Sequence, residues 1–126
     1  MLTEGLNVEL KREYTDDIKK TVIAFANTAG GTIYIGIDDN GQVAGVADGD
    51  DTMLRISASV RNSIKPDITL FVDYRLEKID EKAVVIIDVQ KGASSPYYLS
   101  SKGIRPEGVF VRQGASRSEE RRVGKK

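Results

Sequence analysis

Residues 15–28 carry apolar side chains at the spacing of an amphipathic helix. The apolar positions form one stripe: Ile18, Val22, Phe25, Ala26 and Ala29. Such a stripe is typical of a helix that lies on a hydrophobic core. Thr15 can cap its start, Asp16 and Asp17 complement the positive end of the helix dipole, and Gly30-Gly31 can adopt the left-handed backbone that ends a helix. The pattern therefore predicts a helix from Thr15 to Thr28.

The spacing of apolar residues changes to two directly after these glycines. Residues Thr32–Ile37 place three isoleucines on one face, which predicts a strand. Asp38-Asp39-Asn40-Gly41 is a tight-turn sequence, and Gln42–Val46 is predicted to return as a second strand. Residues 32–46 should therefore form a β-hairpin with Asp38 and Asp39 at its tip.

The second half of the chain predicts one more helix and three more strands. The loop Asp48–Asp51 can cap a helix over Thr52–Ile64, and Pro66 stops it. The strands are predicted at Thr69–Leu76, Ala83–Gln90 and Val109–Arg112, the first two pairing antiparallel through a turn at Glu77–Lys82. These elements indicate one α+β domain with a mixed, mainly antiparallel sheet and two main helices over residues 1–117.

Residues 118–126 differ from the rest because Val123 is their only apolar residue. We expect them to form a flexible basic tail outside the domain, at the start of a truncated or non-native C-terminal extension.

Composition removes several classes of chemistry. The 126 residues include no cysteine and no histidine, which excludes disulfides, zinc fingers, Cys nucleophiles and Ser-His-Asp triads. No apolar run approaches the roughly 20 residues that cross a bilayer, and the charged opening MLTEGLNVELKR is unlike a signal peptide. We therefore expect a cytoplasmic protein without a membrane partner.

Charge is unevenly distributed although the net charge is zero. Residues 1–51 hold four Lys/Arg against ten Asp/Glu, a balance of −6, and residues 52–126 hold 15 against 9, a balance of +6. A basic C-terminal third can meet a phosphate backbone, and clustered acids can hold a hard cation. A charge run is also compatible with solvated surface alone.

One long motif resembles a known family. The run from Phe25 to Asp39, FANTAGGTIYIGIDD, is similar to the signature of the Schlafen-type AlbA-like domain. Two further segments resemble the same family in order and position: Glu4–Lys11 and Val111–Ser116. The resemblance spans roughly residues 3–117, which is nearly the whole predicted domain.

The resemblance implies a nucleic-acid-binding domain. Most prokaryotic members are described as N-terminal modules of transcriptional regulators, so the resemblance implies a DNA or RNA partner and C-terminal regulator domains that are absent from this chain. A homodimer is expected, because the animal Schlafen enzymes use two such modules to hold RNA. The binding function requires no cofactor. A protein-interaction module remains a third possibility, since the net charge is zero.

The animal Schlafen ribonucleases imply an alternative function. They cleave RNA with three carboxylates, which correspond by position to Glu4, Glu9 and Asp39 in this chain. Under this alternative the three residues would be catalytic and would bind Mg²⁺ or Mn²⁺, ions that prefer carboxylate oxygens. The competing interpretation is that Asp38 and Asp39 serve only the turn.

Candidate nucleic-acid contacts are basic and come mainly from the C-terminal third. They are Lys11, Lys102, Arg105, Arg112 and Arg117. Tyr97 and Tyr98 could stack on unpaired bases, although half-buried strand positions explain them equally. Asn27 and Thr28 could face a ligand, but bonds to nearby backbone are the expected role.

Overall fold

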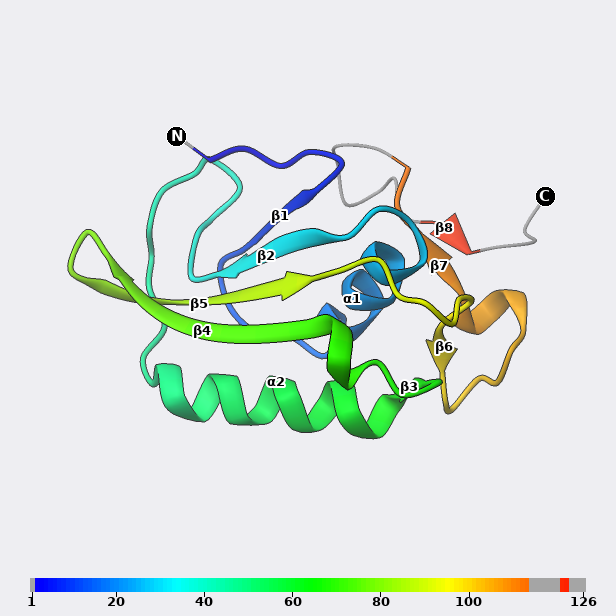
Figure 1. Ribbon diagram of the computed structural model, residues 1–126. Coiled ribbons are helices and arrows are strands. Elements are labelled where there is room, and N and C mark those ends of the chain that lie inside the picture. The colour runs from blue at the N-terminus through cyan, green and yellow to red at the C-terminus, as the bar shows by residue number, and fades with distance from the viewer. Residues whose placement is uncertain (1, 114–120, 123–126) are drawn as a thin grey trace.

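The sheet at the centre of the protein carries both helices on one face (Figure 1). The computed structural model describes residues 2–113 and the backbone of Arg121–Arg122. The strand order is β1-β2-β5-β4. Their bounds are Val8–Lys11 for β1, Gly31–Ile35 for β2, Lys82–Val89 for β5 and Val72–Ile79 for β4. Because β1 is parallel to β2 and the other pairs are antiparallel, the predicted α+β fold with a mixed, mainly antiparallel sheet is confirmed.

Helix α1 spans Ile18–Asn27 and begins later than the sequence predicts. Asp17 precedes it without a capping hydrogen bond from its side chain. Asp16 and Asp17 instead pair with lysines one turn along, at 2.8 Å to Lys19 and 3.2 Å to Lys20. The proposed Thr15 cap is therefore wrong, because Thr15 contributes only its carbonyl oxygen, which accepts from Ile18 N at 3.1 Å.

Helix α2 spans Gly49–Ser63 and begins earlier than the sequence predicts. The Asp48 carboxylate accepts a hydrogen bond from Asp51 N at 3.0 Å, so the predicted capping loop is itself the first turn. The helix ends before Pro66, and the strand β3 (Ile64–Lys65) follows at once. It pairs antiparallel with β6 (Tyr98–Leu99), which brings the end of α2 beside the C-terminal third of the chain.

The predicted return strand over Gln42–Val46 is wrong. The turn itself forms, since Gly41 N donates to Asp38 O at 2.9 Å, but only an isolated bridge joins Ile37 to Val43. No regular pairing with β2 can follow, because β1 and β5 occupy its two edges. Gly36, at φ +113°, ends the strand where a Cβ would lie 3.3 Å from the carbonyl oxygen of Ala83.

The hairpin β4–β5 is confirmed with shifted bounds. Thr69–Phe71 form a short 3-10 helix, η1, and β4 begins only at Val72. The turn is shorter than predicted, with Asp80 and Glu81 at φ 50° and 66° between paired residues Ile79 and Lys82. This geometry is that of a two-residue hairpin.

Hydrophobic residues fill both sides of the sheet. The larger cluster lies between the sheet and the two helices and includes Phe25, Ile33, Ile56, Val85 and Tyr97. The smaller cluster lies on the other face, where the N-terminal segment and residues 37–43 cover it, and includes Leu10, Ile37, Val84 and Ile86.

The C-terminal third adds short elements at one end of the sheet (Figure 1). The 3-10 helix η2 (Pro106–Gly108) leads into β7 (Phe110–Val111), which pairs with β8 (Arg121–Arg122). The sequence pattern predicts no element in the 118–126 tail, and the paired β8 differs from that prediction. The other residues of the predicted tail lie outside the described part of the chain.

Candidate nucleic-acid interface

A buried ion cluster joins β1 to β7. Glu9 is fully buried, and its Oε1 lies 2.7 Å from Arg112 Nη1. Lys11 Nζ lies 3.1 Å from the other carboxylate oxygen. A fully buried carboxylate is tolerated when cations neutralise it, so this cluster explains how Glu9 enters the core.

Arg112 is held by more than this ion pair. Its Nη2 donates to the carbonyl oxygens of Gly5 and Val8 at 2.9 and 3.1 Å, and its guanidinium carbon lies 5.0 Å from the centre of the Phe25 ring. The side chain is fully buried. Arg112 therefore fixes the N-terminal segment to β7 and is not exposed to an external phosphate, contrary to the sequence-based expectation.

Glu4 lies in the electrostatic field of the other two predicted site carboxylates. Its Oε2 accepts from Leu10 N at 3.3 Å. Burial raises the pKa of Glu4 above its usual value, and the negative charges of Glu9 and, more weakly, Asp39 raise this pKa further. The fold thus brings Glu9 and Asp39 within electrostatic reach of Glu4.

The donor set nevertheless does not fit a divalent metal ion. Each oxygen of Glu9 already faces a cationic side chain, Arg112 on one side and Lys11 on the other. Within residues 2–113, no group of three or more acidic side chains is arranged to hold a metal ion. Binding of Mg²⁺ or Mn²⁺ by the three carboxylates stays a prediction, and we derive no cleavage step from it.

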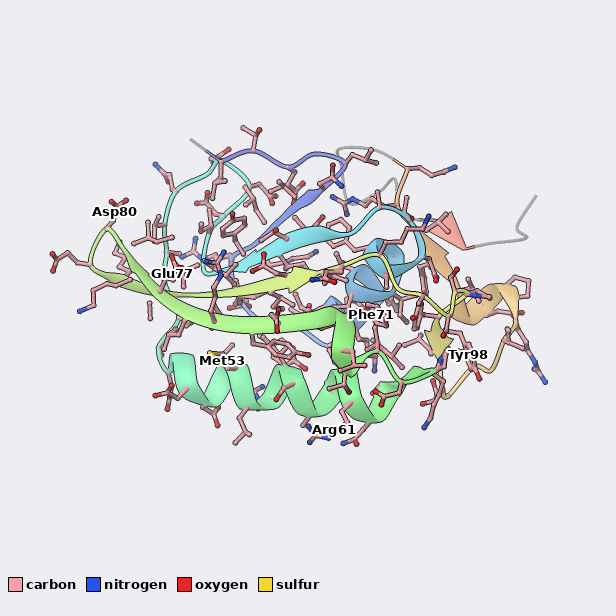
Figure 2. All side chains as sticks on the ribbon, viewed as in Figure 1. Met53, Arg61, Phe71, Glu77, Asp80 and Tyr98 are labelled. Atoms are coloured by element: carbon pink, nitrogen blue, oxygen red, sulfur yellow. The ribbon has the colours of Figure 1, made fainter. Side chains whose placement is uncertain are left out.

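Exposed cations lie instead beside the short strands at one end of the sheet. Lys102 and Arg105 are exposed in the loop between β6 and η2, and Lys65 is exposed on β3. Lys65 is paired in register with Tyr98 of β6, which is half-buried and labelled in Figure 2. We call Lys65, Tyr98, Lys102 and Arg105 the basic end.

The three cations of the basic end are available for an anionic ligand. Lys65, Lys102 and Arg105 take part in none of the ion pairs formed among the described residues. Asp67 and Glu107 are the nearest acids in sequence to these residues, and both are exposed. Backbone hydrogen bonds hold the loop in a turn, because the amides of Lys102 and Gly103 both donate to Leu99 O at 3.0 Å.

The structure separates the five predicted basic contacts into different environments. Lys102 and Arg105 are exposed, whereas Lys11 is half-buried against Glu9 and Arg112 is buried. Arg117 lies outside the described residues. Sequence reasoning missed Lys65, because β3 and β6 have two residues each and two residues show no periodicity.

Tyr97 and Tyr98 also lie in different environments. Tyr97 is fully buried, its hydroxyl accepts from Ser94 N at 3.0 Å, and it cannot stack on a base. Tyr98 is half-buried, so a base can reach part of this residue.

Asn27 and Thr28 bind backbone, as expected. Asn27 Nδ2 donates to the carbonyl oxygens of Tyr97 and Phe110 at 3.0 Å each. Thr28 Oγ1 accepts from Arg112 N at 2.9 Å. Both side chains therefore join the end of α1 to the C-terminal third of the chain.

A hollow of about 550 Å³ lies at the other end of α2, and its charged lining is net negative. Arg12 and Arg55 line it together with Glu13, Asp48 and Asp51. Arg55 pairs with Asp51 at 3.6 Å and covers the Tyr14 ring at 5.2 Å. The three carboxylates of the hollow outnumber its two arginines, so the basic end is the better candidate for nucleic acid.

Fold and surface together define an α+β domain of one mixed sheet and two helices that presents a basic end. In the part of the chain that the structure describes, no helix has the length and apolar character needed to cross a membrane. The family model "Schlafen, AlbA_2" matches residues 4–120, and the chain belongs to this family. No curated protein matches the sequence.

Two solved structures share the fold. The DIP2311 protein from Corynebacterium diphtheriae is 22% identical, with a TM-score of 0.69; the match covers 94% of this chain and 22% of that one. The second is the N-terminal domain of a protein from Nitrosomonas europaea related to the ATP-dependent DNA helicase RecG. It is 22% identical, with a TM-score of 0.61, and the match covers 95% of this chain and 78% of that one. This chain thus spans about a fifth of the first structure.

Proposed function

We propose that this domain binds nucleic acid through its basic end. Family membership and the fold shared with the N-terminal domain of a RecG-related protein support a role on nucleic acid. We further propose that it serves as the N-terminal module of a prokaryotic transcriptional regulator, acts in the cytoplasm and functions as a homodimer. The match to only 22% of a longer structure supports the modular role.

The observation that carries the proposal is the exposure of Lys102 and Arg105 in one ordered loop. Both lack an ion-pair partner among the described residues, so neither must break an internal contact to reach a phosphate. Lys and Arg on such a surface displace condensed counterions from the nucleic acid, which favours binding at low salt. Tyr98 beside Lys65 adds a ring on which an unpaired base can stack.

The test is fluorescence anisotropy with labelled duplex DNA and single-stranded RNA. Lys102→Glu and Arg105→Glu should each raise the Kd about tenfold, since a lost phosphate contact and a new repulsion together cost about 1.4 kcal/mol. Lys82→Glu is the control with the same charge change, because Lys82 is exposed at the opposite end of the sheet, where its Nζ donates to Val43 O at 3.2 Å. It should leave the Kd within about twofold.

Equal affinity of all four proteins would contradict the proposed surface. Absence of binding to either nucleic acid at low salt would contradict the function itself and would favour a protein-interaction module. The RNA should stay intact when Mn²⁺ is added, because Glu9 is already neutralised by Lys11 and Arg112. Cleavage that depends on Mn²⁺, is lost when a chelator is added and is lost in Asp39→Asn would restore the metal-dependent alternative.

A further inference from the structure

Strand β4 forms one outer edge of the sheet. All eight of its residues are paired with β5, and within the described part of the chain its other edge pairs with no strand. Figure 1 shows β4 in green at this edge, above α2. A long open edge presents unpaired N–H and C=O groups, which makes it a template for a further strand.

The register with β5 identifies the backbone groups that point outward. Gln90 N donates to Phe71 O at 2.8 Å, and the two-residue turn at Asp80–Glu81 makes Ile79 and Lys82 a hydrogen-bonded pair. Hydrogen bonding alternates along an antiparallel ladder, so the odd-numbered residues of β4 point to β5. The even-numbered residues therefore offer their backbone groups to a partner: Val72, Tyr74, Leu76 and Lys78.

Apolar side chains are exposed along this edge. Leu76 is 39% exposed, and Leu54 on the adjacent flank of α2 is 67% exposed. A shallow hollow of about 250 Å³ lies between α2 and β4, and Met53 and Tyr74 line it together with Leu54. These side chains would be covered by a strand that pairs with the open edge of β4.

We propose that two copies of this chain pair antiparallel through β4, with Leu76 opposite Leu76 on the two-fold axis. In this register the N–H of each Leu76 donates to the C=O of the partner's Leu76, and Tyr74 pairs with the partner's Lys78. On the other face of the sheet Arg75 already pairs with Glu77 of its own strand at 2.7 Å and with Asp88 at 3.2 Å. Across the axis it also lies opposite the partner's Glu77, and the same contact recurs by symmetry. The strand sequence is thus complementary to itself in charge.

Neighbouring registers are less favourable. An axis at Arg75 places Arg75 opposite the partner's Arg75 and Asp73 opposite the partner's Glu77, which are like-charge pairs. An axis at Tyr74 places the partner's Lys78 opposite Leu70. Leu70 lies in η1, before the start of β4 at Val72, and has no strand geometry. The Leu76-centred register uses the whole of β4, and it joins two four-stranded sheets into one continuous sheet.

The first test uses the absence of cysteine from the natural sequence. Directly opposite residues of an antiparallel pair lie close enough for a disulfide, whereas positions two residues from the axis are too far from their own equivalents. Under mild oxidation Leu76→Cys should form a covalent dimer, and Lys78→Cys should remain a monomer. Equal cross-linking of both variants, or of neither, would overturn the register.

The second test asks whether the dimer needs the charge pairing, and it measures the mass in solution by sedimentation equilibrium at about 100 µM protein. The wild type should have twice the 13.8 kDa mass of one chain. Arg75→Glu and Glu77→Arg should each be monomeric, because like charges then face each other. An equimolar mixture of the two variants should recover the dimer, since every pair across the axis becomes complementary again.

Recovery on mixing separates an interface from a folding defect, because two unfolded chains cannot restore one another. Circular dichroism of each variant checks its helix content. A monomeric wild type, or a mixture that stays monomeric while both variants are folded, would overturn the proposal. This inference rests on the homodimer of the proposed function, which a monomeric wild type would overturn as well. Nucleic-acid binding by the basic end does not depend on these outcomes.

Discussion

At the scale of single residues, Arg112 shows how burial decides the role of a charge. It lies in the basic C-terminal third that the sequence marks for phosphate contacts, yet its side chain is fully buried against Glu9. The pair holds β7 to β1, and Arg112 also satisfies the carbonyl oxygens of Gly5 and Val8. Removing one member leaves the other as an uncompensated charge in the core.

Arg112→Met should therefore lower the free energy of unfolding by about 3 kcal/mol, because Glu9 then retains only the partly exposed Lys11. Urea denaturation of the variant and wild type measures this loss. The double variant Glu9→Leu with Arg112→Met should recover roughly half of it, since no unpaired buried carboxylate remains.

Arg55→Met is the matched control, because the Arg55–Asp51 pair is more than half exposed. It should cost less than about 1 kcal/mol. A loss this small in Arg112→Met would show that the buried pair does not stabilise the fold.

Glu4 provides a pH-dependent test of the same region. Its pKa is raised above 4.5 in the folded protein, chiefly by burial and then by the charge of Glu9, so the folded state binds this proton more tightly than the unfolded chain. The contribution of Glu4 to stability is thus favourable below pH 4.5 and is lost as the pH rises through the folded pKa.

Glu4→Gln should consequently be more stable than the wild type at pH 7, and this advantage should shrink toward pH 4. Gln keeps an oxygen that can accept from Leu10 N. Urea denaturation of both proteins at the two pH values measures the difference, and a difference that does not change with pH would refute the assignment.

At the scale of elements, the end of α1 organises the C-terminal third of the chain. Asn27 bonds the backbone of Tyr97 and Phe110, so one side chain connects α1 with β6 and β7. Asn27→Ala should cost about 2 to 3 kcal/mol in urea denaturation, because these part-buried backbone groups lose their partners. Asn40→Ala, at an exposed turn, should change stability by less than about 0.5 kcal/mol. Equal effects of the two variants would contradict this role of Asn27.

The elements that could be predicted from the sequence are those whose periodicity is local. Helix α1, helix α2 and the hairpin β4–β5 each show a stripe or an alternation long enough to read, with bounds shifted by a few residues. The return strand over Gln42–Val46 failed because β1 takes the edge of β2 that it would need. The two segments that compete for this edge are distant in sequence. A local pattern of apolar residues cannot show such a competition.

At the scale of the whole molecule, the net charge is zero, but the fold leaves some basic side chains exposed and buries others. The sequence identified Lys102 and Arg105, which the fold leaves exposed at the basic end, but could not distinguish them from Arg112. The difference depends on Glu9, which comes from the opposite end of the chain. Lys65 joins the basic end only because β3 pairs with β6.

The account's central claim, that the basic end contacts phosphates, is tested most directly by the salt dependence of binding. The Kd for duplex DNA should be measured between about 50 and 200 mM salt for the wild type, the double variant Lys102→Ala with Arg105→Ala, and the control Lys82→Ala. Each phosphate contact that is lost should lower the slope of log K against log salt by about 0.9, so the double variant should lose about 1.8 and the control nothing. Identical slopes for all three proteins would contradict the claim.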